Sequence, residues 1–341
     1  MNYYISVQGG TGLNISLASF LTFVKPNHPE DKYFVTSPYY DIFEACSAVD
    51  GVYKPNEMRD FIFDAIHTKN SKIINTRLYD LDKFIRKELN YSEAWALLMG
   101  YKDFNDTPEG TSVKSVLEPY KVYPQLKSQV ETIQKVIKEK GFKNYAIMQF
   151  TGGQSPLTQA PNGDWSKVPY DYQNEPLKRH YPIDKAQKFV ELYHNANPDT
   201  AIILYQLPNE PKPEAPYIFT NVMPYLAYYE LAKSAKEVVT IDSSLQHLVA
   251  GVCPTTVIWG HTINANKKKI LKNNFGYSYN KNIVQPCRRD DILYFTALGS
   301  SWAKVQYIEP EELLRLVSID SSVPTNYIYS DVEDCYVEIV D

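Results

Sequence analysis

Three consecutive polar residues, Asp242, Ser243 and Ser244, form a group that could bind a ligand. They follow a β-branched run at residues 238–241, typical of a strand, and precede an apolar segment at residues 245–252, typical of a helix. Asp and Ser are favoured N-cap residues, so ordinary helix capping is one explanation of the pattern. Free backbone N–H groups and the positive end of the helix dipole also meet at such a turn, so phosphate binding is the other.

The segments around this turn follow one another as strand, helix and strand. A second β-branched run at residues 255–259 follows the apolar segment and ends at Gly260. Together the three segments match a parallel βαβ unit. Strand-like and helix-like segments alternate in the same way along most of the chain, which predicts an α/β protein.

Two other predicted strands, residues 2–8 and residues 145–150, end in glycine-rich turns. Such a turn allows a ligand to approach the backbone closely, although a bare turn needs no ligand. Neither turn has the dinucleotide GxGxxG pattern or the Walker Lys-Ser/Thr pattern. The two similar openings predict two Rossmann-like halves. The glycines that we expect at a ligand are Gly10, Gly12, Gly152 and Gly153.

An amphipathic segment separates the two predicted halves. Its apolar residues fall on one helical face, and Gly141 ends it. A chain of 341 residues is long for one core and comfortable for two domains. We predict an N-terminal domain at residues 1–125 and a second domain at residues 126–305. Residues 306–341 are expected to form a C-terminal helix and an acidic tail, with an edge strand at residues 327–329.

The composition argues against several classes of protein. No apolar run reaches the roughly 18 residues that cross a bilayer, and we expect no secretory signal because the N-terminus lacks a basic start. Four scattered cysteines without a CxxC pair indicate reduced thiols and a cytoplasmic protein. A net charge of -5 gives no general attraction to nucleic acid or to an anionic membrane. The 28 tyrosines and many Lys and Asn residues are typical of an AT-rich coding genome, such as a viral one.

The stretch that starts at Asp242 resembles a known signature. It reads Asp-Ser-Ser-Leu-Gln-His-Leu-Val-Ala-Gly. It is similar to the Asp-Thr-Gly-Leu-Ser-His-Leu-Ala-Ala-Ala signature of the heptosyltransferase-like glycosyltransferases, the ADP-heptose:lipopolysaccharide group. The resemblance implies a GT-B fold, in which two Rossmann-like α/β domains face each other across a cleft. The residues that match are Asp242, Leu245, His247, Leu248 and Ala250.

In that family the aspartate contacts the donor sugar, and the turn after it holds the donor's phosphates. The resemblance therefore implies that Asp242 contacts the sugar and takes part in catalysis. It also implies that Ser243, Ser244 and Leu245 bind the donor. Ser243 keeps a hydroxyl at its position, whereas Ser244 replaces a glycine. His247 lies one helical turn beyond Ser243, where it either faces the phosphates or is a buried structural histidine.

Two weaker matches extend the resemblance. Lys178 and Arg179 lie in a segment similar to the family's Lys-x-Trp-Pro, which implies that they lie near the donor phosphates. A solvated charge cluster is the alternative explanation for this pair. The segment that begins at Gln206 and ends at Glu210 corresponds to the family's Gly-Gly-x-x-Glu and shares only its glutamate. The match implies that Glu210, with Gln206, lies near the donor ribose.

The family's general base is an aspartate in the first glycine turn, and this chain has none there. Leu13 or Asn14 occupies its place, and neither accepts a proton at neutral pH. We predict that the Pro-, Gly- and Asp-rich segment at residues 100–120 closes over bound donor and supplies the carboxylate. Asp106 is assigned to that role, with Asn14 positioning the acceptor by hydrogen bonds. Asp103, Asp106 and Glu109 are the acids of that segment that we consider for the role.

Together these features predict a metal-independent glycosyltransferase that moves a sugar from a nucleotide-sugar to an acceptor hydroxyl, on a glycan or a modified nucleic-acid base. No cofactor is expected, and the six histidines show no metal-ligand spacing. Asp80 and Asp82 match the Asp-x-Asp motif of the other glycosyltransferase fold, but they precede a predicted helix, where capping is the better explanation. Two alternatives stay open. One is a phage-type DNA glycosyltransferase acting on a hydroxymethylated base, and the other is a non-catalytic nucleotide-sugar-binding protein.

Overall fold

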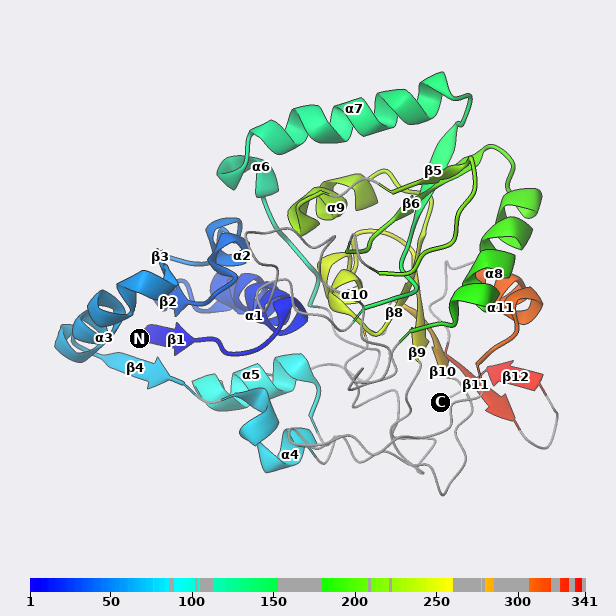
Figure 1. The fold of residues 1–341 in the computed structure, drawn as a ribbon. Coiled ribbons are helices and arrows are strands. Elements are labelled where there is room, and N and C mark those ends of the chain that lie inside the picture. The colour runs from blue at the N-terminus through cyan, green and yellow to red at the C-terminus, as the bar shows by residue number, and fades with distance from the viewer. Residues whose placement is uncertain are drawn as a thin grey trace. The chain divides into compact units, whose positions relative to one another are not determined.

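The computed structural model describes most of the chain, which divides into two compact units. One unit is built on residues 1–127 and the other on the residues from 128 onward. Each unit has its own largely parallel sheet with helices packed on it (Figure 1). The described residues are 1–75, 77–85, 89–101, 104, 113–152, 180–207, 210–220, 223–259, 277, 280–284, 307–319, 326–330 and 335–338.

The first unit contains a four-stranded sheet in the order β3-β2-β1-β4, and all of its strand pairs are parallel. The chain moves from β1 to β2 and β3 on one side and returns to β4 on the other, so the strand order reverses between β1 and β4. The strands are β1 (Asn2–Ser6), β2 (Lys32–Thr36), β3 (Gly51–Tyr53) and β4 (Ser71–Ile74). The helices are α1 (Thr11–Val24), α2 (Tyr40–Glu44), α3 (Met58–His67), α4 (Asp82–Ile85), α5 (Tyr91–Met99) and α6 (Pro119–Val122), with 3-10 turns at Lys25–Asn27, Pro55–Glu57 and Leu78–Asp80.

Helix α5 shows how local sequence sets an element of this unit. It begins at a capping box, in which the Asn90 side chain accepts from the N–H of Glu93 at 2.9 Å and Glu93 accepts from the N–H of Asn90 at 2.8 Å. It ends at Gly100, whose φ of 86° is left-handed. Its Trp95 donates to the Ser16 hydroxyl at 3.1 Å and so joins α5 to the buried helix α1.

The second unit contains an eight-stranded sheet in the order β12-β11-β10-β9-β8-β5-β6-β7. The pair β11–β12 is antiparallel and the others are parallel. The chain runs outward from β5 to β6 and β7, then crosses to β8 and continues through β9 and β10, so the order reverses between β5 and β8. The strands are β5 (Asn144–Met148), β6 (Thr200–Leu204), β7 (Ile218–Phe219), β8 (Val238–Ile241), β9 (Thr255–Trp259), β10 (Lys281–Val284), β11 (Asn326–Ser330) and β12 (Cys335–Glu338).

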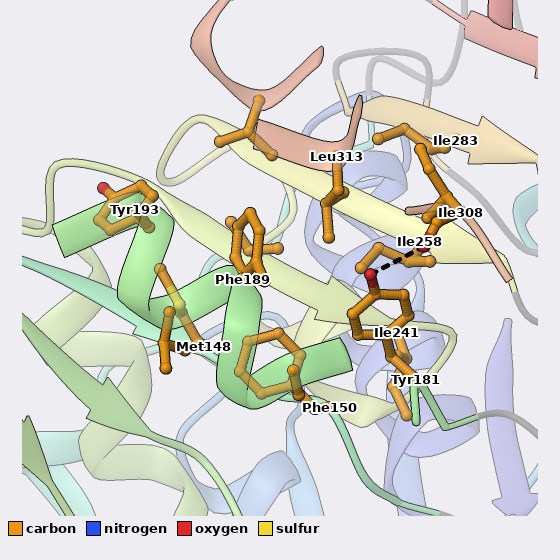
Figure 2. Packing of buried hydrophobic residues seen from close by; sticks show 14 of the residues in the cluster. Met148, Phe150, Tyr181, Phe189, Tyr193, Ile241, Ile258, Ile283, Ile308 and Leu313 are labelled. Atoms are coloured by element: carbon orange, nitrogen blue, oxygen red, sulfur yellow. Dashed lines mark hydrogen bonds between the residues drawn. The ribbon is translucent and has the colours of Figure 1, made fainter. Parts of the chain in front are cut away.

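Two helices of the second unit pack against each other over one large core cluster. Phe189 of α8 and Leu313 of α11 lie in that cluster with Ile241, Ile258 and Ile283, which come from three neighbouring strands (Figure 2). Burying one such side chain contributes about 1.5–3 kcal/mol. The helices of this unit are α7 (Gln125–Glu139), α8 (Ile183–Ala196), α9 (Tyr225–Ala232), α10 (Ser244–Leu248) and α11 (Pro310–Ser318).

The end of the chain is part of the second sheet. Strands β11 and β12 extend the sheet beyond β10, so the predicted strand at residues 327–329 lies inside β11, and β12 forms the edge instead. Lys281 of β10 is only 2% exposed, and its ammonium donates to the carbonyls of Leu316 at 2.7 Å, Val317 at 3.1 Å and Ile319 at 2.7 Å. This cation at the negative end of α11 fixes the helix to the sheet.

Among the helices of the described ranges, none has both the length and the apolar character that a membrane span requires.

Candidate functional site

The turns at the carboxyl ends of β5, β6 and β8 meet where the strand order of the second sheet reverses. Open α/β sheets bind ligands outside the carboxyl ends of their strands at such a switch point. Here the turn after β5 contains Thr151 and Gly152, and the turn after β8 contains Asp242 to Ser244. These two turns, together with Tyr205 to Glu210 after β6, form the candidate site.

Asp242 is a buried carboxylate at the start of α10. It is 3% exposed, and its Oδ1 accepts a hydrogen bond from Nε2 of Gln246 at 2.6 Å. Asp242 lies just before the N-cap Ser243, and Gln246 of the first helical turn reaches back to it. Gln246 therefore holds the carboxylate in one orientation.

The next two residues use their hydroxyls within the protein. Ser243 is the N-cap of α10, and its Oγ accepts from the N–H of Leu245 at 3.2 Å. The hydroxyl of Ser244 bonds to that of Tyr205, which follows β6, at 3.1 Å. The helix ends at Leu248, because Gly251 takes a left-handed φ of 69°, and not at residue 252 as predicted. A helix this short sums few peptide dipoles, so the turn offers N–H groups rather than a strong macrodipole.

Glu210 is a second buried acid of the site. It is 5% exposed, and its Oε2 accepts from the N–H of Leu207 at 2.8 Å and from the hydroxyl of Thr151 at 3.3 Å. Burial raises the pKa of this carboxyl to about 7, against the smaller lowering effect of the two hydrogen bonds. The acid therefore exchanges its proton close to neutral pH. Gln206 lies half-buried at the start of the same turn.

Gly152 packs closely between the two main turns. A Cβ at this position would lie 3.1 Å from Nε2 of Gln149 and 3.5 Å from Cδ1 of Ile241. Alanine at this position would press on Gln149, so packing within the protein favours glycine here whether or not a ligand approaches it. Its neighbour Gly153 lies outside the described residues.

His247 is held against a tyrosine. It is buried, and its Nδ1 is hydrogen-bonded to the hydroxyl of Tyr277 at 2.8 Å, with the two rings edge to face at 5.5 Å. Leu245 beside it is fully buried. The contact joins α10 to the segment before β10, which fits the structural explanation of this histidine.

The glycine turn of the first unit is organised by Asn14. This side chain is fully buried; its Nδ2 donates to the carbonyl of Gly10 at 2.9 Å, and its Oδ1 accepts from the Ser37 hydroxyl at 2.5 Å. Gly10 is the N-cap of α1 and Gly12 lies in its first turn. Asn14 thus ties the turn after β1 to the turn after β2.

Several residues assigned from the sequence cannot be placed. Lys178 and Arg179 lie outside the described residues, as do Asp103, Asp106 and Glu109. The structure thus brings together Asp242, Ser243, Ser244, Gly152, Gln206 and Glu210 at one sheet edge.

One group in the described part of the chain could hold a metal ion: His28, Glu30 and Asp31. Both Asp31 oxygens already accept hydrogen bonds at 2.8 Å, one from the N-terminal amine and one from the Tyr101 hydroxyl. The group precedes β2, at the amino edge of the first sheet. Asp80 pairs with Arg77 at 3.4 Å, and Asp82 stands in the first turn of α4, as the capping interpretation expects.

Sequence reasoning missed three residues of the site. Gln149 and Tyr205 contact the turn after β8 from neighbouring strands, and Gln246 holds Asp242. Only Gln246 has a sequence signal, because it follows Asp242 by four residues and a side chain in the first turn of the helix can reach back over that distance. The contacts of Gln149 and Tyr205 depend on the strand order, which the sequence does not show.

Comparison with known proteins adds to this geometry. No protein-family model matches the chain, and no curated protein matches its sequence. Among solved structures, E. coli ADP-heptose LPS heptosyltransferase II is similar with a TM-score of 0.54 at 11% identity, over 93% of this chain and 97% of that one. A glycosyl transferase family 9 protein from Veillonella parvula is similar with a TM-score of 0.53 at 12% identity, over 83% and 86% of the two chains. The resemblance seen in the stretch from Asp242 is thereby confirmed at the level of the fold, which this chain shares with these glycosyltransferases.

Proposed function

We propose that this protein is a metal-independent glycosyltransferase of the GT-B type that binds a nucleotide-sugar at the carboxyl edge of its second sheet. The observation that carries the proposal is the buried carboxylate of Asp242, held by Gln246 at the switch point of that sheet. Asp242 matches the aspartate of the heptosyltransferase signature, and the likeness of fold spans most of the chain. The first support is a short sequence motif and the second is the similarity of the whole fold, so the two supports are independent of each other.

Each group of the site has a role in this proposal. Asp242 accepts hydrogen bonds from hydroxyls of the donor sugar, and Glu210 accepts one from the ribose. The turn at Ser243 and Ser244 gives backbone N–H groups to the diphosphate, and Lys178, with Arg179, adds positive charge. Such groups stabilise the leaving diphosphate without a metal ion. The name of the similar E. coli enzyme makes an ADP-linked heptose the first donor to test.

The transfer itself needs a proton acceptor on the other side of the sugar. The acceptor hydroxyl attacks the anomeric carbon, the bond to the diphosphate breaks, and the proton goes to a carboxylate. Asn14 cannot take that proton, and its amide is bonded inside its own unit. Asp106 is our assignment for the base, delivered by the segment around residues 100–120.

The first experiment asks what the protein binds and transfers. Calorimetry with ADP-, GDP- and UDP-sugars, with and without EDTA, is followed by a product assay on glycan acceptors and on DNA with hydroxymethylated bases. We expect binding and transfer that survive EDTA. Complete loss of activity in EDTA, restored by manganese, would contradict metal independence and direct attention to Asp80 and Asp82.

The second experiment tests Asp242 directly. Asp242→Asn keeps an acceptor for Gln246 but loses the charge, so donor affinity should fall by about 1.5–3 kcal/mol, roughly 10- to 150-fold. Asp199→Asn is the matched control, because Asp199 pairs with Lys143 at the amino edge of the same sheet. The control should bind donor normally. Equal affinity in Asp242→Asn and the wild type for every nucleotide-sugar would refute the assignment.

One alternative function has specific support. A nucleotide-sugar-binding protein without transferase activity needs no base, and neither Leu13 nor the buried, hydrogen-bonded amide of Asn14, the two candidates for the place of the family's aspartate, can take a proton. This alternative replaces the first if the wild-type protein binds donor but transfers sugar to no acceptor, water included.

A further inference from the structure

One glutamine connects the two main turns of the candidate site. Gln149 directly follows β5 and is 4% exposed. Its Oε1 accepts from the Thr240 hydroxyl at 3.1 Å and from the Ser243 hydroxyl. Its Nε2 donates to the carbonyl of Thr151 at 2.8 Å. A single side-chain amide therefore bonds to the turn after β5 on one end and to β8 with its turn on the other.

The orientation of this amide follows from its partners. The Thr151 carbonyl only accepts hydrogen bonds, so it must face Nε2, and the Ser243 hydroxyl then donates to Oε1. The Thr240 hydroxyl lies 3.1 Å from both Oε1 and the Ile241 carbonyl and shares its one proton between them. A backbone hydrogen bond also fixes this position. The N–H of Gln149 donates to the carbonyl of Val239 at 2.9 Å, which holds Gln149 beside Thr240. The contact is thus determined by sheet register and not by a free rotamer.

The bond to Gln149 also defines what Ser243 does. A serine hydroxyl has one proton, and that of Ser243 goes to Gln149, while its oxygen accepts from the N–H of Leu245 at 3.2 Å. The hydroxyl is therefore used to hold the turn, and the groups that the turn can offer to a ligand are its backbone N–H groups and the Asp242 carboxylate.

Close packing leaves the glutamine little freedom. A Cβ at Gly152 would lie 3.1 Å from Nε2 of Gln149 and 3.8 Å from Cβ of Ser243. There is thus little space between Gly152, Gln149 and Ser243 for the glutamine side chain to move. Movement of Gln149 would disturb both turns together.

We propose that Gln149 is a positioning residue for the donor: it holds Ser243, and through it the backbone from Asp242 to Ser244, in the arrangement that receives the sugar and the diphosphate. The inference rests on the proposed function and deepens it. Groups that are fixed before binding need not be ordered when the ligand arrives, so losing the fixation lowers affinity without removing any contact to the ligand.

The test compares two glutamines near opposite ends of β5. Gln149→Met keeps the length of the side chain and removes its hydrogen bonds. Gln134→Met is the matched control, because Gln134 donates to the hydroxyls of Tyr145 at 3.2 Å and Ser234 at 2.9 Å, at the amino end of the strand. Dissociation constants for ADP, GDP and UDP are measured by calorimetry, with hydrogen exchange of the two turns in the free protein.

We expect Gln149→Met to bind the nucleoside diphosphates about tenfold more weakly and to exchange faster in both turns. Gln134→Met should keep wild-type affinity even where it loses stability. Ser243→Ala gives a second readout, because a residue that acts through Ser243 has a non-additive effect with it. The double variant should therefore bind the nucleoside diphosphates no more weakly than whichever single variant has the lower affinity.

A conservative variant tests whether the lost affinity can be restored by a change of pH. Gln149→Glu keeps the acceptor for the two hydroxyls but places a carboxylate oxygen against the Thr151 carbonyl. Protonation restores the lost donor, so its affinity relative to the wild type at the same pH should recover as the pH falls. A purely structural role predicts no such recovery in affinity.

The outcomes separate the two proposals. If the wild type binds none of the three diphosphates, the proposed function fails and this inference fails with it. If the wild type binds but Gln149→Met binds equally well, or Gln134→Met weakens binding as much, the inference alone is overturned. Additive effects of Gln149→Met and Ser243→Ala would also overturn it.

Discussion

The glycine turn after β1 and the turns at the carboxyl edge of the second sheet have equivalent topological positions but different buried polar groups. Each lies where strand order reverses, the place at which open α/β sheets bind ligands. In the first unit the buried group is Asn14, a neutral amide bonded to Gly10 and Ser37. In the second unit the buried groups are the acids Asp242 and Glu210.

The energetic cost of the two arrangements differs. A neutral amide with its hydrogen bonds made costs little to bury, and Asn14 improves the order of its own turn. A buried carboxylate is costly unless it is paired or protonated, and the raised pKa of Glu210 shows that cost directly. Acids that remain in such places are candidates for function rather than for stability. The comparison therefore makes the buried acids of the second unit the first candidates for a functional test, in line with our proposal that the donor binds there, whereas Asn14 supplies no base to the turn of the first unit.

The largest expected effect concerns that missing base. Among Asp103→Asn, Asp106→Asn and Glu109→Gln, we expect Asp106→Asn to lower turnover by about 100- to 10,000-fold, the usual worth of general-base catalysis. Donor affinity measured by calorimetry should stay unchanged, because the base acts on the acceptor. The other two variants serve as charge-matched controls. Wild-type turnover in all three would show that none of these three acids is the base.

The next effect concerns Glu210 and depends on pH. Its pKa rises from 4.5 to about 7 in the folded protein, so between these values the folded state binds more protons than the unfolded state. Stability is therefore lost as the pH rises through this window, by about 3 kcal/mol at about 1.4 kcal/mol for each pKa unit. Glu210→Gln cannot ionise and avoids this loss.

Denaturant unfolding of the wild type and of Glu210→Gln, at pH 4.5 and at pH 8, measures the prediction. The variant should gain about 3 kcal/mol on the wild type between the two pH values. Glu57→Gln is a control, because Glu57 is only partly buried in the first unit, where its carboxylate accepts from the N–H of Lys54 at 2.8 Å and caps a 3-10 turn. A pH-independent difference between wild type and Glu210→Gln would show that Glu210 titrates normally.

The sequence predicted those elements whose signals are local. The strands on either side of the Asp242 turn, Val238–Ile241 and Thr255–Trp259, have the predicted bounds, because β-branching acts between near neighbours. The periodicity rule failed at residues 249–252, where apolar residues continue the helical pattern. These residues form a turn instead, with the N–H of Val252 donating to the Val249 carbonyl at 2.9 Å. Val249 and Ala250 are fully buried, so their apolar character reflects burial and not helicity.

The candidate site was predictable only in part, for a physical reason. Asp242 and its capping serines were visible because a strand end and a helix start adjoin in the sequence. The bond between Gln149 and Ser243 joins residues 94 positions apart, and it exists because β5 and β8 are neighbours in the sheet. Strand order is decided by packing of the whole unit, so no local pattern shows which side chains meet at the switch point.

A third prediction asks whether the first unit can be given the family's acid. Asn14→Asp replaces the amide donor with a carboxylate oxygen that faces the carbonyls of Gly10, at 2.9 Å, and Gly9, at 3.4 Å. We expect a loss of about 1–3 kcal/mol in unfolding free energy and no gain in turnover. Asn14→Gly distinguishes loss of the bonds from repulsion, since it removes the side chain without adding charge. A rise in turnover of 100-fold or more in Asn14→Asp would mean that this turn is still the site of the base.

The smallest effect compares one glycine from each region. Gly10 and Gly152 both lie outside the left-handed backbone region, so alanine is conformationally allowed at each and the difference lies in the space around them. A Cβ at Gly10 meets no atom within 4 Å, whereas a Cβ at Gly152 lies 3.1 Å from Nε2 of Gln149. Gly10→Ala should change stability by less than about 0.5 kcal/mol, because the lost N-cap preference and the stiffer unfolded chain offset each other. Gly152→Ala must displace the glutamine by a few tenths of an ångström and should cost on the order of 1 kcal/mol.

The displacement also strains the bond from Gln149 to Thr151, so Gly152→Ala should weaken diphosphate binding while Gly10→Ala leaves it unchanged. Thermal unfolding and calorimetry on the two variants measure both effects. Equal behaviour of the two glycines would mean that the close packing at the second switch point has no bearing on binding.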